Sequence, residues 1–194
     1  MMKLLCSNIL PLSLNEGQQS ISECFLEQAE KSDRIEIAVG YISKASLIEL
    51  DRIVEEYNIQ SICLNIGMYY LEGMPEGSYH TACAINEKWI QKGIGEIRMI
   101  TPFKYHGKTY CFYNSGNPVA AIIGSANLGV IKLEASNRRQ YEVSAVTDNP
   151  DECREIDSLI MRLKSDRCSA NIRDIENITL IREINTSLNQ IENV

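Results

Sequence analysis

The sequence predicts an α/β domain, and three observations support this class. Residues 15–93 alternate segments whose apolar residues recur at helical spacing with short β-type runs. Residues 95–146 then carry short β-type runs in close succession. The chain has 194 residues, of which 44% are apolar and 7% aromatic, the size and composition of one globular domain. We therefore expect helices layered on a single sheet.

The first half of the chain predicts helices and strands in turn. The expected elements are a helix over 15–31, a strand over 34–42, a helix over 43–57, a strand over 61–68, a loop over 68–78 and a helix over 80–92. Alternating apolar residues at Ile35, Ile37 and Val39 support the first strand. Ser43 is a typical helix N-cap, and Gly93 is a typical residue after a helix end.

The second half predicts four short strands and one clear helix. The expected strands cover 97–100, 108–113, 119–123 and 141–146. The sequence Asn-Ser-Gly-Asn over 114–117 predicts a tight turn between two of them. Asn149 can cap a helix that has Pro150 at its first position. Isoleucines three or four residues apart over 171–194 predict a helical tail that needs a surface to pack against.

Composition excludes several classes of protein. No apolar run approaches the roughly 20 residues that a membrane-spanning helix needs, so we expect no membrane partner. The apolar start of the chain is interrupted by Asn8 and Pro11, which argues against a signal peptide. Seven widely spaced cysteines without a Cys-x-x-Cys pair favour reduced thiols in a cytoplasmic protein. His80 and Cys83 lack further ligands at zinc spacing, so no metal site is expected.

The charge of the chain is unevenly distributed. The net charge of −7 argues against a general binder of phosphate backbones. However, residues 97–133 contain four basic residues and no acidic one. On charge alone, an anion site and a set of buried strands explain this span equally well. The motifs inside the span favour the anion site.

Two short motifs lie in this acid-free span. His106-Gly107-Lys108 places an imidazole and an ammonium two residues apart, which in a strand puts both on the same face. Gly124-Ser125-Ala126-Asn127 follows an apolar strand and offers a hydroxyl, a carboxamide and backbone amides to a phosphate. In this order the two motifs resemble the HKD motif of the phospholipase D superfamily, H-x-K-x4-D-x6-G-S-x-N. The resemblance implies a mixed β-sheet flanked by helices, with one HKD motif in the chain.

The match departs from the family pattern in one place. Fifteen residues, 109–123, separate Lys108 from Gly124, where the pattern has eleven, and Tyr113 stands where the pattern has Asp. A longer hairpin at the 114–117 turn would absorb the four extra residues. Glu142 lies where nucleases of the family place a carboxylate that hydrogen-bonds the catalytic imidazole.

The sequence resembles the nuclease branch of the superfamily, in particular the restriction endonucleases of the NgoFVII and BfiI type. The likeness rests on Phe103–Lys108 and Gly124–Gly129 and implies a metal-independent DNA endonuclease without cofactor. It implies a catalytic domain over 1–170, with 171–194 as a helical tail or linker toward a possible DNA-recognition domain.

The resemblance also assigns roles to individual residues. His106 would form a phosphohistidine, and Glu142 would orient its ring. Lys108, Asn127 and Ser125 would hold the phosphate oxygens. Lys104, Arg138 and Arg139 would contact the DNA backbone or be ordinary surface charges.

The reaction also needs a second group, an acid that protonates the leaving oxygen. One HKD motif supplies only one histidine. His80 is a poor candidate for that acid, because it lies in a predicted helix after a glycine-rich loop. We therefore expect a homodimer with one active site shared at its interface. Two alternatives remain open, namely a nonspecific nuclease or phospholipase of the same superfamily, and a noncatalytic module for DNA binding or dimerisation. The recognition sequence cannot be inferred, since no base-reading motif is visible.

Overall fold

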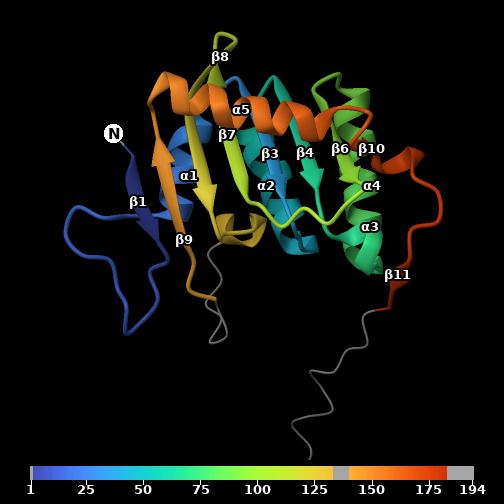
Figure 1. The fold of residues 1–194 in the computed structure, drawn as a ribbon, viewed down its shortest axis with the longest axis horizontal. Helices are drawn as coiled ribbons and strands as arrows, with labels where there is room; N and C mark the ends of the chain where they lie inside the picture. The colour runs from blue at the N-terminus through green and yellow to red at the C-terminus, as the bar shows by residue number, and fades with distance from the viewer. Residues whose placement is uncertain (1, 133–139, 183–194) are drawn as a thin grey trace, which may run out of the picture.

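The fold is built around one mixed β-sheet of nine strands (Figure 1). The computed structural model describes residues 2–132 and 140–182. In sheet order the strands are β10 (Ser169–Asn171), β6 (Gly95–Ile100), β4 (Ser61–Ile66), β3 (Arg34–Val39), β7 (Thr109–Asn114), β8 (Asn117–Gly124), β9 (Val143–Thr147), β1 (Lys3–Cys6) and β2 (Gln19–Ser20). Strands β3, β4 and β6 pair parallel with one another, and β1 pairs parallel with β2. The pairs β10–β6, β3–β7, β7–β8, β8–β9 and β9–β1 are antiparallel. The expected mixed α/β class is confirmed.

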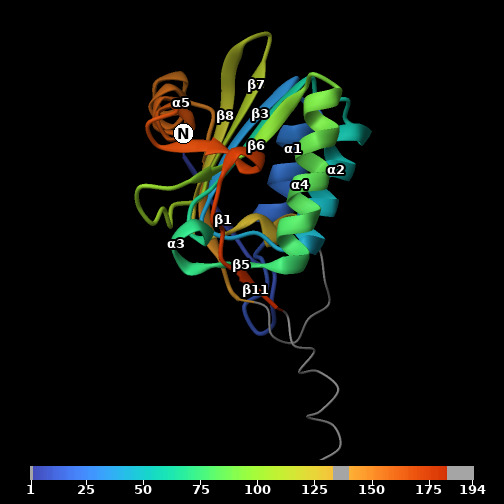
Figure 2. The same cartoon turned by 90° about the vertical axis from the view of Figure 1, so that its right-hand side faces the viewer.

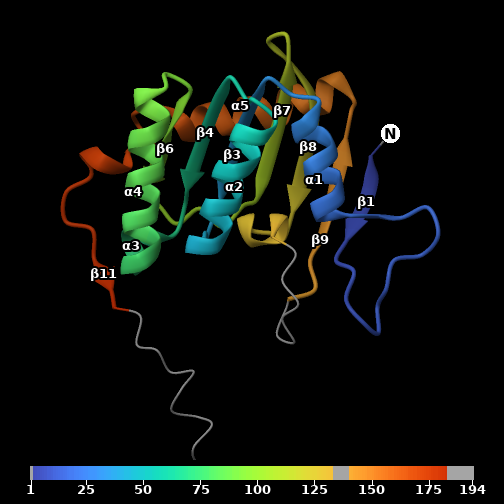
Figure 3. The same ribbon diagram turned by 180° about the vertical axis from the view of Figure 1, so that it is seen from behind.

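Helices cover both faces of this sheet. Three of them, α1 (Ile21–Glu30), α2 (Lys44–Glu56) and α4 (Glu76–Gln91), lie side by side on one face (Figure 3). Helix α5 (Pro150–Lys164) crosses the opposite face, as the side view shows (Figure 2). At the lower edge in these views lie α3 (Tyr69–Glu72) and a small sheet of β5 (Met74–Pro75) and β11 (Leu180–Ile181). The 3₁₀ helices are η1 (Leu128–Ile131) and η2 (Ile172–Asp174).

The core between the sheet and the three-helix layer is almost wholly apolar. Phe25 of α1 packs edge-on against Tyr110 and Phe112 of β7, with ring centroids 5.7 and 5.4 Å apart. The α5 side of the sheet carries charges as well. There, the fully buried carboxylate of Glu36 accepts ion pairs from Arg34 at 2.9 Å and Lys164 at 3.0 Å. The pairs compensate a charge that burial alone would strongly disfavour.

Several local predictions are confirmed by the capping geometry. The Ser43 side chain accepts a hydrogen bond from the Ser46 amide and caps α2. Asn149 accepts hydrogen bonds from the amides of residues 151 and 152, with Pro150 in the first turn of α5. The 114–117 turn joins β7 to β8, and both of its central residues have positive φ. All seven cysteines are free, and four of them are buried.

The start of the chain and the 68–78 segment differ from the expectation. Residues 3–6 form β1 inside the sheet, and α1 begins at Ile21 instead of residue 15, because residues 19–20 pair with β1. The expected loop over 68–78 contains α3 and β5 and begins α4. No helix in the described residues is long and apolar enough to cross a membrane.

The expected helix over 171–194 is wrong for the part that the structure describes. Up to residue 182, the tail forms the end of β10, the 3₁₀ turn η2 and the short strand β11. Ile172 is fully buried, and Ile175 and Ile178 pack against the main core. The isoleucine spacing therefore marks contacts of an irregular segment. Residues 183–194 lie outside the described part.

Candidate active site

The motif residues gather at the edge of the sheet where β3 and β8 end and β7 and β9 begin (Figure 1). They reach this edge on three separate stretches of chain. One stretch carries His106 and Lys108, another carries Ser125 and Asn127, and Glu142 stands just before β9. The backbone connects the three, because the Gly124 amide donates to the Lys108 carbonyl at 3.1 Å and the Ser125 amide donates to the Val143 carbonyl at 2.9 Å.

The residue that follows β4 anchors the segment containing His106. The Tyr105 amide donates to the Gly67 carbonyl at 2.9 Å. Gly67 must be glycine for this approach, since a Cβ there would lie 2.1 Å from the Tyr105 carbonyl oxygen. His106 and Lys108 precede β7 instead of lying in a strand, so the expectation of a shared strand face is wrong. The imidazole is exposed, whereas Lys108 is only 4% exposed.

Lys108 is a largely desolvated cation within the site. Its Nζ donates to the main-chain carbonyl of His106 at 2.5 Å. Desolvation lowers the pKa of Lys108 below its ordinary value, and the negative charge of Glu142 opposes part of this shift. A cation so placed interacts more strongly with an anion than one in water would. This favours binding of a phosphate.

Ser125 and Glu142 face each other across the ends of β8 and β9. The Ser125 hydroxyl donates to the Glu142 carboxylate and accepts from the Val143 amide at 3.0 Å. Gly124 permits this approach, because a Cβ there would lie 2.3 Å from the Ser144 hydroxyl. The bond expected between Glu142 and His106 is not among the hydrogen bonds of the described residues; the carboxylate is engaged by Ser125.

Asn127 is oriented by the segment that follows β3. Its Oδ1 accepts a hydrogen bond from the main-chain amide of Tyr41 at 3.0 Å, so the carboxamide nitrogen remains as the donor end. The buried Tyr110 hydroxyl donates to the main-chain carbonyl of Ala126, the residue before Asn127, at 2.7 Å. The Ser-x-Asn turn is thus held from two sides.

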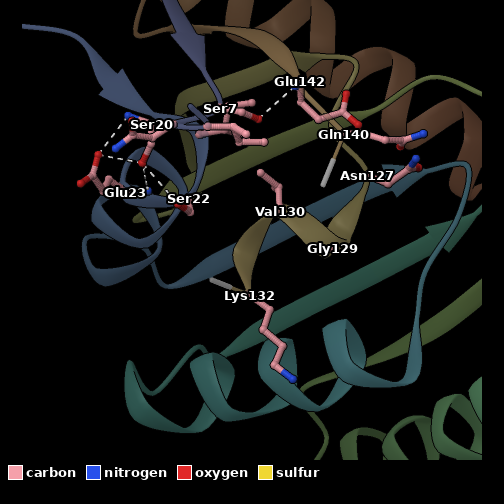
Figure 4. A pocket seen from close by; sticks show the side chains of 13 residues that line it. Ser7, Ser20, Ser22, Glu23, Asn127, Gly129, Val130, Lys132, Gln140 and Glu142 are labelled. Carbon is pink, nitrogen blue, oxygen red and sulfur yellow. Dashed lines mark hydrogen bonds between the residues drawn. The ribbon is translucent and has the colours of Figure 1, made fainter. Parts of the chain in front are cut away.

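A cavity of about 580 Å³ opens beside these residues (Figure 4). Asn127 and Glu142 line it together with the start of α1 and the segment after β1. Ser7 of that segment holds Glu142 by two bonds of 3.0 Å. The Ser7 amide donates to the Glu142 carbonyl, and the Glu142 amide donates to the Ser7 hydroxyl. The first strand therefore fixes where β9 begins.

The residues expected to contact DNA have different outcomes. Lys104 lies two residues before His106 and pairs with Glu72 of α3 at 2.9 Å. Its side chain is half exposed, and its charge is already paired with a carboxylate. Arg138 and Arg139 lie outside the described residues.

Tyr113 replaces the missing Asp of the motif with a structural contact. Its ring is buried in β7, Arg34 stacks over it at 4.3 Å, and its hydroxyl donates to Asp157 of α5. The β7–β8 hairpin turn lies at the sheet edge opposite the site (Figure 1). Extra hairpin length therefore leaves the pairing of Lys108 with Gly124 intact.

Sequence reasoning missed Tyr41, Glu72 and Ser7. Each joins the site through a main-chain group or through a residue far away in the sequence, so no local spacing indicates it. His80 lies on α4 and pairs with Glu76 at 3.7 Å. Within residues 2–132 and 140–182, no group of three or more His, Cys, Asp or Glu side chains is arranged to hold a metal ion.

Comparison with solved structures shows similar folds at low sequence identity. NucT from Helicobacter pylori is 13% identical with a TM-score of 0.57, and the match covers 87% of this chain and 98% of that one. Polyphosphate kinase from Porphyromonas gingivalis is 16% identical with a TM-score of 0.52, over 84% of this chain and 26% of that one. Phosphatidylserine synthase from Haemophilus influenzae is 10% identical with a TM-score of 0.56, over 91% and 41%.

Comparison with protein families is more specific. No curated protein sequence matches the chain. One family model, described as the NgoFVII restriction endonuclease N-terminal PLD domain, matches residues 19–177. This range contains all five motif residues and both layers of helices. The chain therefore belongs to the NgoFVII restriction endonuclease PLD-domain family, a phospholipase D-type nuclease family.

Proposed function

We propose that this chain is the catalytic domain of a type II restriction endonuclease that hydrolyses DNA without a metal ion, through a phosphohistidine. The observation that carries the proposal is the meeting of an exposed imidazole, a desolvated lysine and a Ser-x-Asn turn at one sheet edge. The lysine supplies a positive charge for the phosphate from within the protein, the task that a metal ion performs in other nucleases.

The first step is attack on phosphorus. One nitrogen of the neutral His106 ring forms a bond to phosphorus while the bond to the leaving sugar oxygen breaks. Lys108 and the Asn127 amide stabilise the charge on the nonbridging oxygens. The Ser125 hydroxyl turns from Glu142 to the phosphate, and this frees the carboxylate to accept a hydrogen bond from the second nitrogen of the His106 ring.

Proton transfer requires a second imidazole. The leaving oxygen takes a proton from His106 of a second subunit. That ring, now neutral, accepts a proton from a water molecule, whose oxygen attacks phosphorus and breaks the bond to the first His106. The attacking ring is then regenerated. A homodimer with one shared site supplies both rings, and it cuts the two DNA strands in sequence.

An exposed apolar part of the sheet supports the dimer. Leu4, Ala145 and Ile123 lie in one row across β1, β9 and β8, on the face that α5 covers only farther along. Leu4 is 58% exposed, Ile123 41% and Val143 43%. Val143 directly follows Glu142, so this apolar face borders the site. Its burial against a second copy would be favourable and would place two sites close together.

Plasmid cleavage in excess chelator tests the proposal. We expect cleavage that persists in chelator, is lost in His106→Ala and is retained in His80→Ala, the matched control at the other histidine. With ³²P-labelled DNA we expect a label on the protein that is stable in base and lost in acid, as a phosphohistidine is; a label that survives acid would contradict the intermediate. Cleavage that requires a metal ion would contradict the mechanism, and full activity of a sedimentation-verified monomer would contradict the shared site.

The wild-type and His106→Ala proteins, assayed on other substrates, also distinguish the three alternative functions. A nonspecific nuclease would degrade plasmid and single strands without discrete fragments. A phospholipase would release a headgroup from phosphatidylcholine vesicles. A noncatalytic module would bind DNA in a gel shift with no His106-dependent cleavage of either substrate.

A further inference from the structure

Tyr41 contacts two members of the catalytic set through different groups. Its main-chain amide donates to Asn127 Oδ1 at 3.0 Å. Its ring meets the His106 imidazole edge-to-face, with centroids 5.9 Å apart and planes at 77°. No step of the proposed reaction uses Tyr41. Its place between the two residues nevertheless lets it set the position of both.

The Tyr41 ring is itself held in place from its far end. Its hydroxyl donates to Glu72 Oε2 at 2.6 Å, and its ring packs against Tyr69 of α3 with centroids 5.5 Å apart. Glu72 Oε1 accepts from Lys104 Nζ at 2.9 Å. Lys104 stands two residues before His106. The contacts therefore run from Tyr41 to Glu72 of α3, from Glu72 to Lys104, and along the chain to His106, which itself contacts Tyr41.

The carboxylate at the centre of this arrangement stays charged. Hydrogen bonds from Tyr41 and Lys104 lower the pKa of Glu72, and the pKa of Tyr41 is raised by the same bond. The bond between them is thus a neutral hydroxyl donating to an anion, which is stronger than a bond between two neutral groups. It can hold an aromatic ring at a partly exposed edge of the protein.

We propose that Tyr41 is a positioning residue for the reaction, with its ring orienting the His106 imidazole, its amide orienting Asn127, and the Glu72–Lys104 pair fixing the ring. The inference rests on the proposed function only in taking His106 as the nucleophile. A ring that must attack in line loses rate when its orientation varies.

The chain contains two histidines, and each has a tyrosine ring packed edge-to-face against it, so His80 provides a control for His106. Tyr79 meets His80 edge-to-face at 5.7 Å, and Glu76 pairs with His80 at 3.7 Å. The test records histidine ring resonances by two-dimensional NMR in Tyr41→Leu, Tyr41→Phe and Glu72→Gln, with Tyr79→Leu and Glu76→Gln as the matched variants.

We expect Tyr41→Leu and Glu72→Gln to move the His106 ring signals and leave those of His80 in place, and the matched variants to do the reverse. In plasmid cleavage, kcat should fall about tenfold in Tyr41→Leu with KM within about twofold. Tyr41→Phe, which keeps the ring and loses the tether, should fall about threefold and so rescue part of the loss.

Unchanged His106 signals in Tyr41→Leu, or the same kcat in a folded variant, would overturn the proposal. If Tyr41→Leu does not fold, Tyr41→Phe and Glu72→Gln decide by the same two measurements. Wild-type protein without His106-dependent cleavage would contradict the proposed function instead. The NMR comparison still reports in that case whether Tyr41 orients the imidazole.

Discussion

Replacing Gly67 by alanine tests how the fold positions the candidate nucleophile. The new Cβ would lie 2.1 Å from the carbonyl oxygen of Tyr105 and 2.7 Å from its Cβ. Real Cβ contacts stay above 3.0 Å, so the residue before His106 must retreat by about 1 Å. A displacement of about 1 Å at a reacting group costs about 100-fold in rate.

We therefore expect Gly67→Ala to lower kcat about 100-fold, equivalent to about 2.7 kcal/mol of transition-state stabilisation. Overpacking should also reduce the free energy of unfolding by about 1–3 kcal/mol. The assay is single-turnover plasmid cleavage well below the Tm of each variant, with the folded fraction measured by circular dichroism.

Gly95→Ala provides the matched control. Its Cβ would lie 1.8 Å from the Ile62 carbonyl oxygen, a clash of the same kind where β6 begins, away from the site. This variant should lose stability but keep the kcat of its folded molecules. A Gly67→Ala protein that retains kcat within about threefold of wild type, or an equal loss of kcat in Gly95→Ala, would refute the reasoning.

Three further predictions concern charge. Because burial lowers the pKa of Lys108, cleavage should decline with rising pH below the ordinary lysine value of 10.5, and a Lys108→Arg protein that remains active should not show that decline in a pH–rate profile. The same lowered pKa means that the ammonium destabilises the fold at neutral pH, so Lys108→Met should raise the Tm in calorimetry while abolishing cleavage. Glu36→Gln should reduce the unfolding free energy in urea by about 3 kcal/mol, since two cations lose their buried partner; a change below about 1 kcal/mol would contradict this.

The elements with local signals were predictable from the sequence. Strands 34–39 and 61–66 and the caps at Ser43 and Asn149 each follow from spacing and residue type within a few positions. Four of the five motif residues stand in two short stretches of the sequence, 106–108 and 124–127, and their assignment as site residues stays a prediction. The pairing of β7 with β8 brings the two stretches together, and the pairing of β8 with β9 adds Glu142.

The remaining features depend on contacts between distant residues. Strand β1 has only four residues, and one of its two leucines, Leu4, is exposed, so its pairing with β9 is visible only in the fold. The isoleucine spacing near 172–178 fits a helix equally well, but the chain forms the 3₁₀ turn η2 there and then pairs with β5 as β11. Tyr41 acts partly through its amide, which every residue but proline possesses, and so its residue type gives no indication.

The pairing of β1 with β9 has a consequence for biosynthesis. Lys3 pairs with Val146, so β1, which precedes the other strands of this sheet in the sequence, can complete its pairing only after β9 has been synthesised. Until then nothing holds Glu142 against Ser7, and contacts so distant in sequence form slowly. A nascent chain would carry His106 and Lys108 before the carboxylate beside them is secured. Completion of the site is thereby delayed until most of the domain has been translated, which separates synthesis of a potential nuclease from its activity.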